Sequence, residues 1–509
     1  MFDQTKVLLI FAAVCFGSFV AVGAQTPSET PPPPSEPTAF KVPAVRETTL
    51  DNGLKVVLVE KKGLPLVTAG LLVKRGAGSE SQRLAGLANM TATLLTKGTE
   101  YSTSTEIAEQ IEYLGGSINS RADWESSTIT LNVMKDGLGK ALSIMSDAAI
   151  RPSFPQGEIE LLKKRTLDGF KVSLKQPGSL WSYVASRYSY GEHLIGGTPE
   201  TVARIRRANI INFHKRNYRP ENSVLIFTGD VSETSAFGYA KLFFGNWGQA
   251  SGKRTPAAKR TPAVDYIGQA KERVIERILV VDLANSGQAA VGYSKRLEYG
   301  RAYCEPGGDC IPSRVYFPAT VLNSVLGGGY SARLNQEIRL KRGLSYGARS
   351  NFGWRAAKTN FSAIAQTKNE SAAQVAELVR LEIEKLVNTD VSDAEMKPRK
   401  AVVTGGFGRG LQTNNGLAAR LRDLYLYDLR PEELNSYMSA VGVVSSAGLK
   451  DFAANNLKGG DLIIVGDAKL FMEDLQKRFS NMTIEVIKAE NLDLNSDNIR
   501  KNTRRRIAK

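Results

Sequence analysis

The stretch of sequence that decides the fold reads Gly86-Leu-Ala-Asn89-Met-Thr-Ala92-Thr93-Leu-Leu-Thr-Lys-Gly-Thr99. Its pattern of apolar residues favours an amphipathic helix over residues 84–95. Taken alone, such a helix is typical of many globular proteins. The informative feature is the fixed spacing between the Gly-Leu-Ala at its start and the Lys-Gly-Thr at its end.

This frame resembles the Gly-Leu-Ala-His-x-x-Glu-His-Met-Leu-Phe-Lys-Gly-Thr stretch of the pitrilysin/insulinase family of metallopeptidases. In that family an inverted H-x-x-E-H motif supplies two zinc ligands and a general base. Asn89 stands at the first histidine, Ala92 at the glutamate and Thr93 at the second histidine. Zinc prefers imidazole, thiolate or carboxylate ligands, and a methyl side chain cannot deprotonate water. The frame is therefore kept while its catalytic groups are absent.

The histidine content of the chain supports this interpretation independently. The two histidines, His193 and His214, are twenty-one residues apart and lie in another segment. An inverted zinc motif needs two imidazoles one helical turn apart, which this pair cannot provide.

The resemblance also implies a third zinc ligand, a glutamate on a later helix, and Gly169 occupies that position here. Asp168 is its neighbour, but one residue along a helix rotates a side chain by about 100°. We therefore expect no metal site in this chain.

The segment from Asn335 to Gly347 carries the residues that we expect to be functional. Residues 321–326 predict a helix stopped by three glycines, and residues 331–342 predict a second helix stopped by Gly343, which suits a left-handed cap. Arg339 would then lie in the last turn and Tyr346 at the start of the next strand, so both side chains can point at one spot. The competing interpretation is a solvated helix-end cation and a tyrosine of the strand core.

In the family, an Arg and a Tyr seven residues apart in such a segment face the zinc site from the opposing domain. Arg339 and Tyr346 have that spacing. The resemblance implies that the guanidinium and the phenol hold a substrate carbonyl and stabilise the oxyanion that forms from it.

A weak internal repeat predicts the domain organisation. Residues 213–230 and 452–467 each read as a helix end, a turn and a buried strand closed by Gly-Asp. Residues 251–263, rich in Lys, Arg, Thr, Pro and Ala, lie between the two copies and are typical of an exposed linker. The alternative is two unrelated segments that share Gly-Asp.

Element patterns within these halves indicate an α+β protein. Residues 53–60 and 66–74 predict two strands that form a hairpin, and residues 127–134 predict another strand. Helices are expected over residues 104–114, 137–149 and 157–170. With the resemblance, we expect two homologous domains, each an antiparallel sheet covered by helices on one face.

The N-terminus reads as a secretory signal, because Lys6 precedes an apolar run from Val7 to Val22 and a Val-Gly-Ala cleavage site. An uncleaved membrane anchor is the alternative, although the run is short for a membrane span. An exported protein, most simply periplasmic and with no stable membrane insertion, follows. The predicted organisation is a signal peptide (1–24), a Pro-rich linker (25–42), an N-terminal peptidase-like domain (43–249), a linker (250–263), a C-terminal peptidase-like domain (264–487) and a basic tail (488–509).

Two cysteines follow the signal, Cys304 and Cys310, separated by Glu-Pro-Gly-Gly-Asp. Export to an oxidising compartment and the Pro-Gly-Gly turn favour a local disulfide, and two free thiols are the alternative. The net charge of +16 admits nucleic acid, anionic membrane surfaces or acidic partners. Export argues against nucleic acid, and the basic end is typical of a solvated tail.

Some members of the two-domain branch of the family work as heterodimers, in which one subunit carries the zinc motif and the other carries the Arg/Tyr pair. This sequence has the second profile. We therefore expect a non-catalytic subunit of an exported zinc endopeptidase, with no cofactor of its own, zinc in the partner subunit and unfolded peptides as substrates that add a strand to a sheet edge. The alternatives are a structural or peptide-binding scaffold without a proteolytic role, and an autonomous peptidase with unusual metal ligands.

Overall fold

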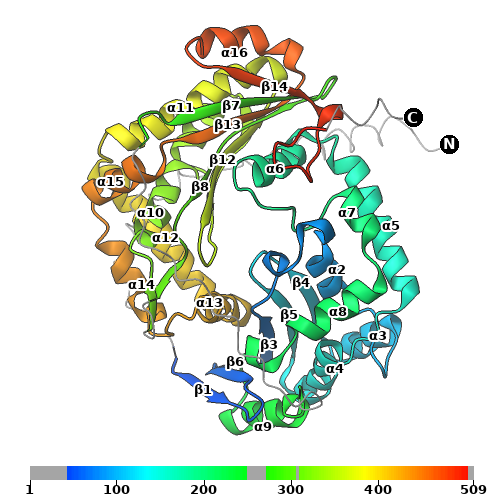
Figure 1. Cartoon of the computed structure of the whole chain (residues 1–509). Coiled ribbons are helices and arrows are strands. Elements are labelled where there is room, and N and C mark those ends of the chain that lie inside the picture. The colour runs from blue at the N-terminus through cyan, green and yellow to red at the C-terminus, as the bar shows by residue number, and fades with distance from the viewer. Residues whose placement is uncertain (1–42, 249–270, 305–308, 502–509) are drawn as a thin grey trace, which may run out of the picture. The chain divides into compact units, whose positions relative to one another are not determined.

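Two six-stranded sheets and the helices around them make up the fold (Figure 1). The computed structural model describes residues 43–248, 271–304 and 309–501. The predicted signal, the Pro-rich linker, the linker at 250–263 and the last eight residues of the predicted tail lie outside the described residues.

The elements around the first sheet are β1 (Val45–Thr49), β2 (Lys55–Glu60), β3 (Leu66–Val73), α2 (Leu87–Leu94), α3 (Ser104–Tyr113), β4 (Ser117–Ala122), β5 (Ser127–Met134), α4 (Leu138–Ile150), α5 (Gln156–Ser173), α6 (Pro177–Tyr188), α7 (Pro199–Arg204), α8 (Arg207–Asn217), β6 (Ser223–Gly229) and α9 (Glu233–Phe244). Those around the second sheet are β7 (Ile275–Asp282), β8 (Ala289–Leu297), β9 (Ala302–Cys304), β10 (Cys310–Pro312), α10 (Tyr316–Leu326), a π-helical segment (Asn335–Leu340), β11 (Ser345–Gly353), β12 (Thr359–Thr367), α11 (Ala372–Asn388), α12 (Asp393–Leu411), α13 (Asn414–Leu426), α14 (Glu433–Gly442), α15 (Ser446–Asn456), β13 (Gly460–Gly466), α16 (Met472–Arg478) and β14 (Ile484–Lys488).

The predicted hairpin of β2 and β3 is wrong. The first sheet has the order β1-β2-β6-β3-β5-β4, so β6 lies between the two strands. It runs parallel to β2 and antiparallel to β3. The alternating apolar residues identify each strand but not its neighbour. The almost continuous burial of β2 and β3 is the mark of interior strands, and β6 returns from far along the chain to fill the gap.

The internal repeat extends to the topology of the sheets. The second sheet has the order β11-β12-β8-β13-β7-β14. Five of its strands match strands of the first sheet in chain order and direction, with β7, β8, β11, β12 and β13 in the places of β2, β3, β4, β5 and β6. The sixth strand differs, because β1 is antiparallel to β2 whereas β14 is parallel to β7.

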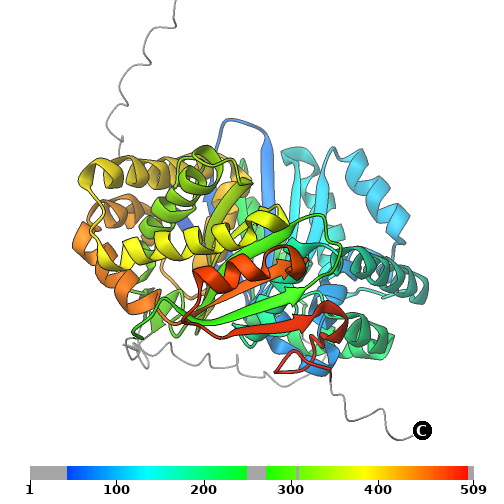
Figure 2. The ribbon, with the colours of Figure 1, turned by 90° about the horizontal axis from the view of Figure 1, so that it is seen from above.

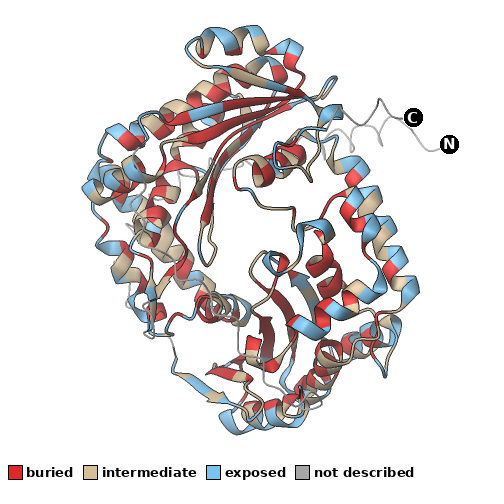
Figure 3. Ribbon diagram, in the orientation of Figure 1, coloured by how far each residue is buried: buried red, intermediate tan, exposed pale blue. Residues whose placement is uncertain are grey.

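The expected α+β class is confirmed, and both sheets are mixed rather than purely antiparallel. Helices α2, α4 and α9 cover one face of the first sheet over an apolar core (Figure 3). On the second sheet α11 packs in the same way, with α16 beside it (Figure 2).

Each sheet also receives, on its other face, one helix from the other half of the chain. Helix α6 lies on the second sheet, where the indole Nε1 of Trp181 donates to the carbonyl of Ile463 at 3.0 Å. Helix α13 lies on the first sheet, where the Thr228 hydroxyl donates to the carbonyl of Asn414 at 3.0 Å. The expectation of helices on one face was therefore incomplete.

A glycine lies under the exchanged helix at equivalent positions of the two sheets, and at Gly292 the helix needs the space that it leaves. Gly70 of β3 pairs with Ile226, and Gly292 of β8 pairs with Ile463, three residues before the Gly-Asp of each repeat. A Cβ added at Gly292 would lie 2.5 Å from the Trp181 ring. Since non-bonded carbon atoms do not approach so closely, the helix can reach the sheet only over a glycine.

Part of the segment assigned to the basic tail packs on the fold. Residues 489–501 follow β14, and Ile499 is fully buried in a cluster with Trp181 and Ile487. Asn495 accepts a hydrogen bond from the Thr198 hydroxyl at 3.0 Å, and Asp497 forms an ion pair with the buried Arg187. The apolar residues of this segment are too sparse to produce a periodic pattern.

The remaining predicted elements appear within a few residues of their expected ends, as α3, α4, α5 and β5. Strand β4 was not predicted, because its sequence Ser-Ile-Asn-Ser-Arg-Ala is mostly polar. Strands β9 and β10 form a short antiparallel ribbon in which a disulfide joins Cys304 to Cys310. Within the described ranges, no helix has the length and apolar character that crossing a bilayer requires.

Replacing Trp181 with alanine tests the helix exchange. The side chain is 4 % exposed, so Trp181→Ala should lower the free energy of unfolding by about 3–5 kcal/mol, through lost burial and the cavity left under α6. Urea denaturation followed by circular dichroism measures this. Tyr113→Ala, at a side chain that is 85 % exposed, is the control and should change it by less than about 0.5 kcal/mol. Equal stability of both variants would contradict the packing role.

Candidate functional site

Helix α2 carries the positions that correspond to the inverted zinc motif. Ala92 is fully buried, while Asn89 and Thr93 are half-buried. The Thr93 hydroxyl donates to the carbonyl of Asn89 at 2.8 Å, and the Ser120 hydroxyl of β4 donates to the carbonyl of Ala92 at 2.7 Å. Both hydroxyl groups therefore donate their hydrogen bonds to backbone carbonyls of α2.

A buried carboxylate holds the start of α2. Gly86 adopts φ +97° at the N-cap, where an added Cβ would lie 2.9 Å from the carbonyl oxygen of Gly196. The Glu80 carboxylate accepts hydrogen bonds from the amides of Gly86 at 2.8 Å and Ala88 at 2.5 Å, where the helix dipole favours negative charge. Burial raises the pKa of Glu80, and a hydrogen bond from His193 opposes this rise.

Both histidines have structural partners. The Nε2 of His193 lies 3.1 Å from Glu80 Oε1 and 3.1 Å from the carbonyl of Ala77. His214 is buried, its Nε2 lies 2.8 Å from the carbonyl of Ala149, and burial lowers its pKa to about 4. Its ring stacks on Tyr218. In the part of the chain that the structure describes, no three His, Cys, Asp or Glu side chains gather as a metal site would require.

Gly169 lies exposed on α5, and a Cβ added there would meet no atom within 4 Å. The neighbouring Asp168 pairs with Lys171 at 2.7 Å, and this hydrogen bond lowers the pKa of Asp168. Four positions correspond to the zinc ligands and the base of the family. They carry the amide of Asn89, the methyl group of Ala92, the hydroxyl of Thr93, which already donates to the backbone, and at Gly169 no side chain. This donor set does not fit zinc.

Arg339 and Tyr346 come together in the structure. The guanidinium lies 4.8 Å from the centre of the Tyr346 ring and 5.0 Å from that of Tyr330, within cation–π range. Tyr346 is 90 % exposed, so it is not a core residue of the strand. This exposure contradicts the competing interpretation, in which Tyr346 is a tyrosine of the strand core.

The helix that carries Arg339 is wound as a π-helix over Asn335–Leu340, which the sequence did not predict. π-Helical turns are rare in proteins, and those that occur are often found at functional sites. The helix ends at Gly343 with φ +64°, the left-handed cap that was expected. The amide of Gly343 donates to the carbonyl of Arg339 at 2.9 Å, and that of Leu344 donates to Ile338 at 2.9 Å. This turn leads directly into β11 and Tyr346.

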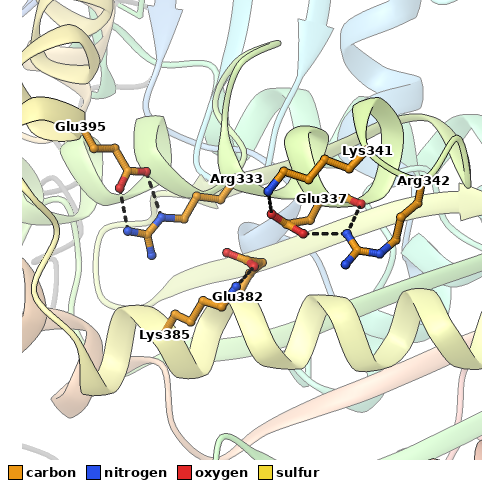
Figure 4. Close-up of polar contacts among 7 residues, drawn as sticks. All are labelled: Arg333, Glu337, Lys341, Arg342, Glu382, Lys385 and Glu395. Atoms are coloured by element: carbon orange, nitrogen blue, oxygen red, sulfur yellow. Dashed lines mark hydrogen bonds and ion pairs between the residues drawn. The ribbon is translucent and has the colours of Figure 1, made fainter.

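The carboxylates near this helix are bound to other cations (Figure 4). Glu337 accepts from Lys341 at 2.5 Å and from Arg342 at 2.6 Å, and these contacts lower its pKa. Glu395 takes both hydrogen bonds of Arg333, at 2.7 and 2.9 Å. Within the described residues no carboxylate forms an ion pair with Arg339, so its charge remains available.

Arg339 and Tyr346 line a pocket of about 600 Å³. The backbone of Gly327–Gly329 forms one wall, and β11 and β12 form another. Asn335 connects the two walls, because its Oδ1 accepts from the amide of Ala348 at 2.8 Å while its Nδ2 donates to the carbonyl of Gly329 at 3.3 Å. The three glycines were read as a helix stop, and their role as a pocket wall was missed.

Sequence reasoning also missed Asn335 and Tyr330. Asn335 opens the segment that was singled out, and Tyr330 follows the third glycine directly. A polar amide at the start of a helix and an aromatic residue in a glycine loop are weak signals alone. They could have been found by asking which groups fix the loop against the helix.

Fold and site together define a protein built like a two-domain metallopeptidase whose metal-ligating positions lack suitable donors. Residues 55–180 match the family model for insulinase (peptidase family M16), and residues 204–402 match the model described as the peptidase M16 inactive domain. The chain belongs to this family, as the sequence frame predicted.

Curated relatives and solved structures agree with this assignment. An uncharacterised zinc protease of Mycobacterium leprae is 25 % identical over 76 % of this chain and 83 % of its own length. The uncharacterised zinc protease YmxG of Bacillus subtilis is 23 % identical over 74 % of this chain and 87 % of its own length. The fold is shared with a peptidase M16 inactive domain from Pseudomonas fluorescens (22 % identity, TM-score 0.72, 83 % of this chain and 98 % of that one). A protease from Helicobacter pylori also shares the fold, with 18 % identity and a TM-score of 0.73 over 84 % of this chain and 100 % of that one. So does the periplasmic protease PqqL from Escherichia coli, with 14 % identity and a TM-score of 0.65 over 88 % of this chain and 52 % of that one.

Acid should destabilise the first half of the chain through His214. Its folded-state pKa of about 4 lies below the ordinary value of 6.5, so the unfolded chain binds the proton more tightly. This contribution is complete near pH 7 and is lost as the pH falls from 6.5 towards 4, by about 3 kcal/mol. His214→Gln retains an N–H donor and cannot titrate, so its unfolding free energy should fall correspondingly less between pH 7 and 4. Identical pH profiles for the two proteins would contradict the buried neutral imidazole.

Proposed function

We propose that this chain is the non-catalytic subunit of an exported heterodimeric zinc endopeptidase. The partner subunit of the same family would carry an intact H-x-x-E-H motif and the zinc ion. This chain would contribute Arg339 and Tyr346 to the active site of that partner, and it would have no cofactor of its own.

The observation that carries this proposal is the state of Arg339. Its guanidinium lies within cation–π distance of two tyrosine rings at a pocket and has no carboxylate partner among the described residues. Forming a cation site without a counter-ion costs free energy, so such sites are typical of places where an anion or a developing negative charge binds. The α2 positions, by contrast, retain no group able to hold the metal or act as a base.

The chemistry of the pair suits a peptide carbonyl. A guanidinium and a phenol both donate hydrogen bonds. These hydrogen bonds would strengthen as the carbonyl oxygen becomes an oxyanion. The turn from the π-helix through Gly343 places the two donors beside each other. Preorganised donors of this kind need no rearrangement during the reaction.

The sheet edge beside the pocket suits an unfolded peptide. Strand β11 is the outer strand of the second sheet, and Tyr346 lies near its start. An extended peptide that pairs with such an edge gains backbone hydrogen bonds independent of its sequence. The predicted N-terminal signal and the likeness to a protein described as a periplasmic protease support export to the periplasm. A scaffold without a proteolytic role remains the alternative, and a stable complex without peptidase activity would favour it.

Co-expression with a zinc-motif subunit tests the role of the pair. Arg339→Ala should lower kcat/KM of the complex for peptide cleavage about 100-fold, and Tyr346→Phe about tenfold, because each removes a donor to the oxyanion. Lys341→Gln is the matched control, since Lys341 lies two residues from Arg339 and pairs with Glu337. Its activity should stay within about twofold. Full activity of both pocket variants in an assembled complex would refute the proposed role.

A further inference from the structure

The pocket of the proposed site contains a second arginine. Arg349 of β11 is one of its lining residues and follows Tyr346 by three positions. The register places Arg349 opposite Ile364 of β12, and Ile364 opposite Gly292 of β8. Residues paired across neighbouring strands point to the same face of a sheet. Arg349 therefore lies on the face that receives α6, because Gly292 lies under Trp181 of that helix.

A β-bulge separates the surroundings of Arg349 from those of Tyr346. The pairing of β11 with β12 is irregular between Ser345 and Ala348, where the Ser345 hydroxyl accepts from the amide of Gly347 at 3.0 Å. Bulged residues turn their side chains away from the regular pattern of the sheet. Tyr346 lies inside this bulge, whereas Arg349 lies beyond it in the regularly paired strand. The phenol and the second guanidinium are therefore different parts of one pocket.

The positive charge of this pocket is not compensated. Of the described residues that line it, none has an acidic side chain. Glu337 and Glu395, the carboxylates of the neighbouring helices, form ion pairs with other cations. Arg349 is exposed, and no described carboxylate forms an ion pair with it or with Arg339. A concave site lined by one sign of charge raises the local concentration of ligands with the opposite charge.

Two glutamines add neutral hydrogen-bond donors to the same pocket. Gln366 of β12 lies two residues after Ile364 and so shares its face, and Gln288 lies just before β8. A Cβ added at Gly178 would lie 2.6 Å from Nε2 of Gln366, which places this amide against the first turn of α6. Both glutamines are exposed, so a ligand can reach them. Two guanidinium groups and two amides without a carboxylate suit an anionic ligand.

We propose that this pocket binds a carboxylate of the peptide substrate through Arg349, while Arg339 and Tyr346 hold the carbonyl of the bond to be cleaved. A planar guanidinium can donate two parallel hydrogen bonds to a carboxylate. Three strand residues span about 10 Å, so this carboxylate should lie within about three residues of that carbonyl. This inference rests on the proposed function, because it names the class of substrate that the complex would prefer.

A peptide offers a carboxylate from two sources, the side chain of an acidic residue and its own C-terminus. Three fluorescent peptides distinguish them in binding to the isolated full chain. They share one uncharged sequence and differ as follows: a central Gln with an amidated C-terminus, a central Glu with an amidated C-terminus, and a central Gln with a free C-terminus. We expect at least one of the two carboxylate peptides to bind about tenfold more tightly than the first, by an amount that falls as salt is raised.

Substitutions then assign the preference to Arg349. Arg349→Gln should reduce the affinity ratio to about one, whereas Arg349→Lys should retain part of it. Arg339→Gln should weaken all three peptides by a similar factor and keep the ratio. Arg314→Gln is the matched control, because it removes the same charge from an exposed residue of the same half that does not line the pocket. It should keep both the affinities and the ratio.

Equal affinity for the three peptides would overturn the proposal, and so would a ratio that Arg349→Gln leaves unchanged. A ratio lost to the same extent in Arg314→Gln would overturn it as well, since only net charge would then matter. Binding is measured here without cleavage, so none of these results bears on the oxyanion role of Arg339 and Tyr346. If the assembled complex failed the cleavage test instead, a ratio that depends on Arg349 would still show a carboxylate-binding pocket.

Discussion

The exchange of helices α6 and α13 between the two sheets is the constraint on which the rest of the structure depends. Each helix covers the face of the sheet formed by the other half, and each lies over a glycine at an equivalent position, Gly292 or Gly70. A side chain at Gly292 would collide with the Trp181 ring. Because both halves contribute to both packed faces, neither sheet can expose that face without losing apolar burial. The exchange therefore fixes where the edge strands β4 and β11 lie relative to the helices beside them.

The two halves share a topology and differ in chemistry. In the first half, the carbonyls of Asn89 and Ala92 accept hydrogen bonds from hydroxyl groups, and the methyl group of Ala92 is buried in the core. In the second half, a π-helix and a glycine wall form a pocket around Arg339 and Tyr346. Carboxylates near that pocket are bound by other cations, which leaves Arg339 uncompensated. An unpaired guanidinium group is thus what the pocket of the second half offers to a ligand.

The sequence predicted much of this arrangement, because its strongest signals are local. The α2 frame, the Gly343 cap and the Gly-Asp repeat were all readable from spacing alone. The order of the strands was not, since a buried strand such as β2 does not encode which strand returns beside it. Nor could the sequence reveal that Trp181 lies over Gly292, a contact between residues far apart in the chain. The π-helical winding of Asn335–Leu340 and the packing of Ile499 were missed because neither produces a periodic pattern. The geometry of Arg339 and Tyr346 was anticipated through the family resemblance, whereas Asn335 and Tyr330 became visible only in three dimensions.

The account as a whole requires that any hydrolytic metal come from another polypeptide. The most direct measurement is the zinc content of the purified chain, alone and in complex with a zinc-motif subunit, combined with a peptidase assay of each. We predict no stoichiometric zinc and no cleavage for the isolated chain, and zinc with cleavage for the complex. One tightly bound zinc per isolated chain, with turnover that a chelator abolishes, would contradict the account.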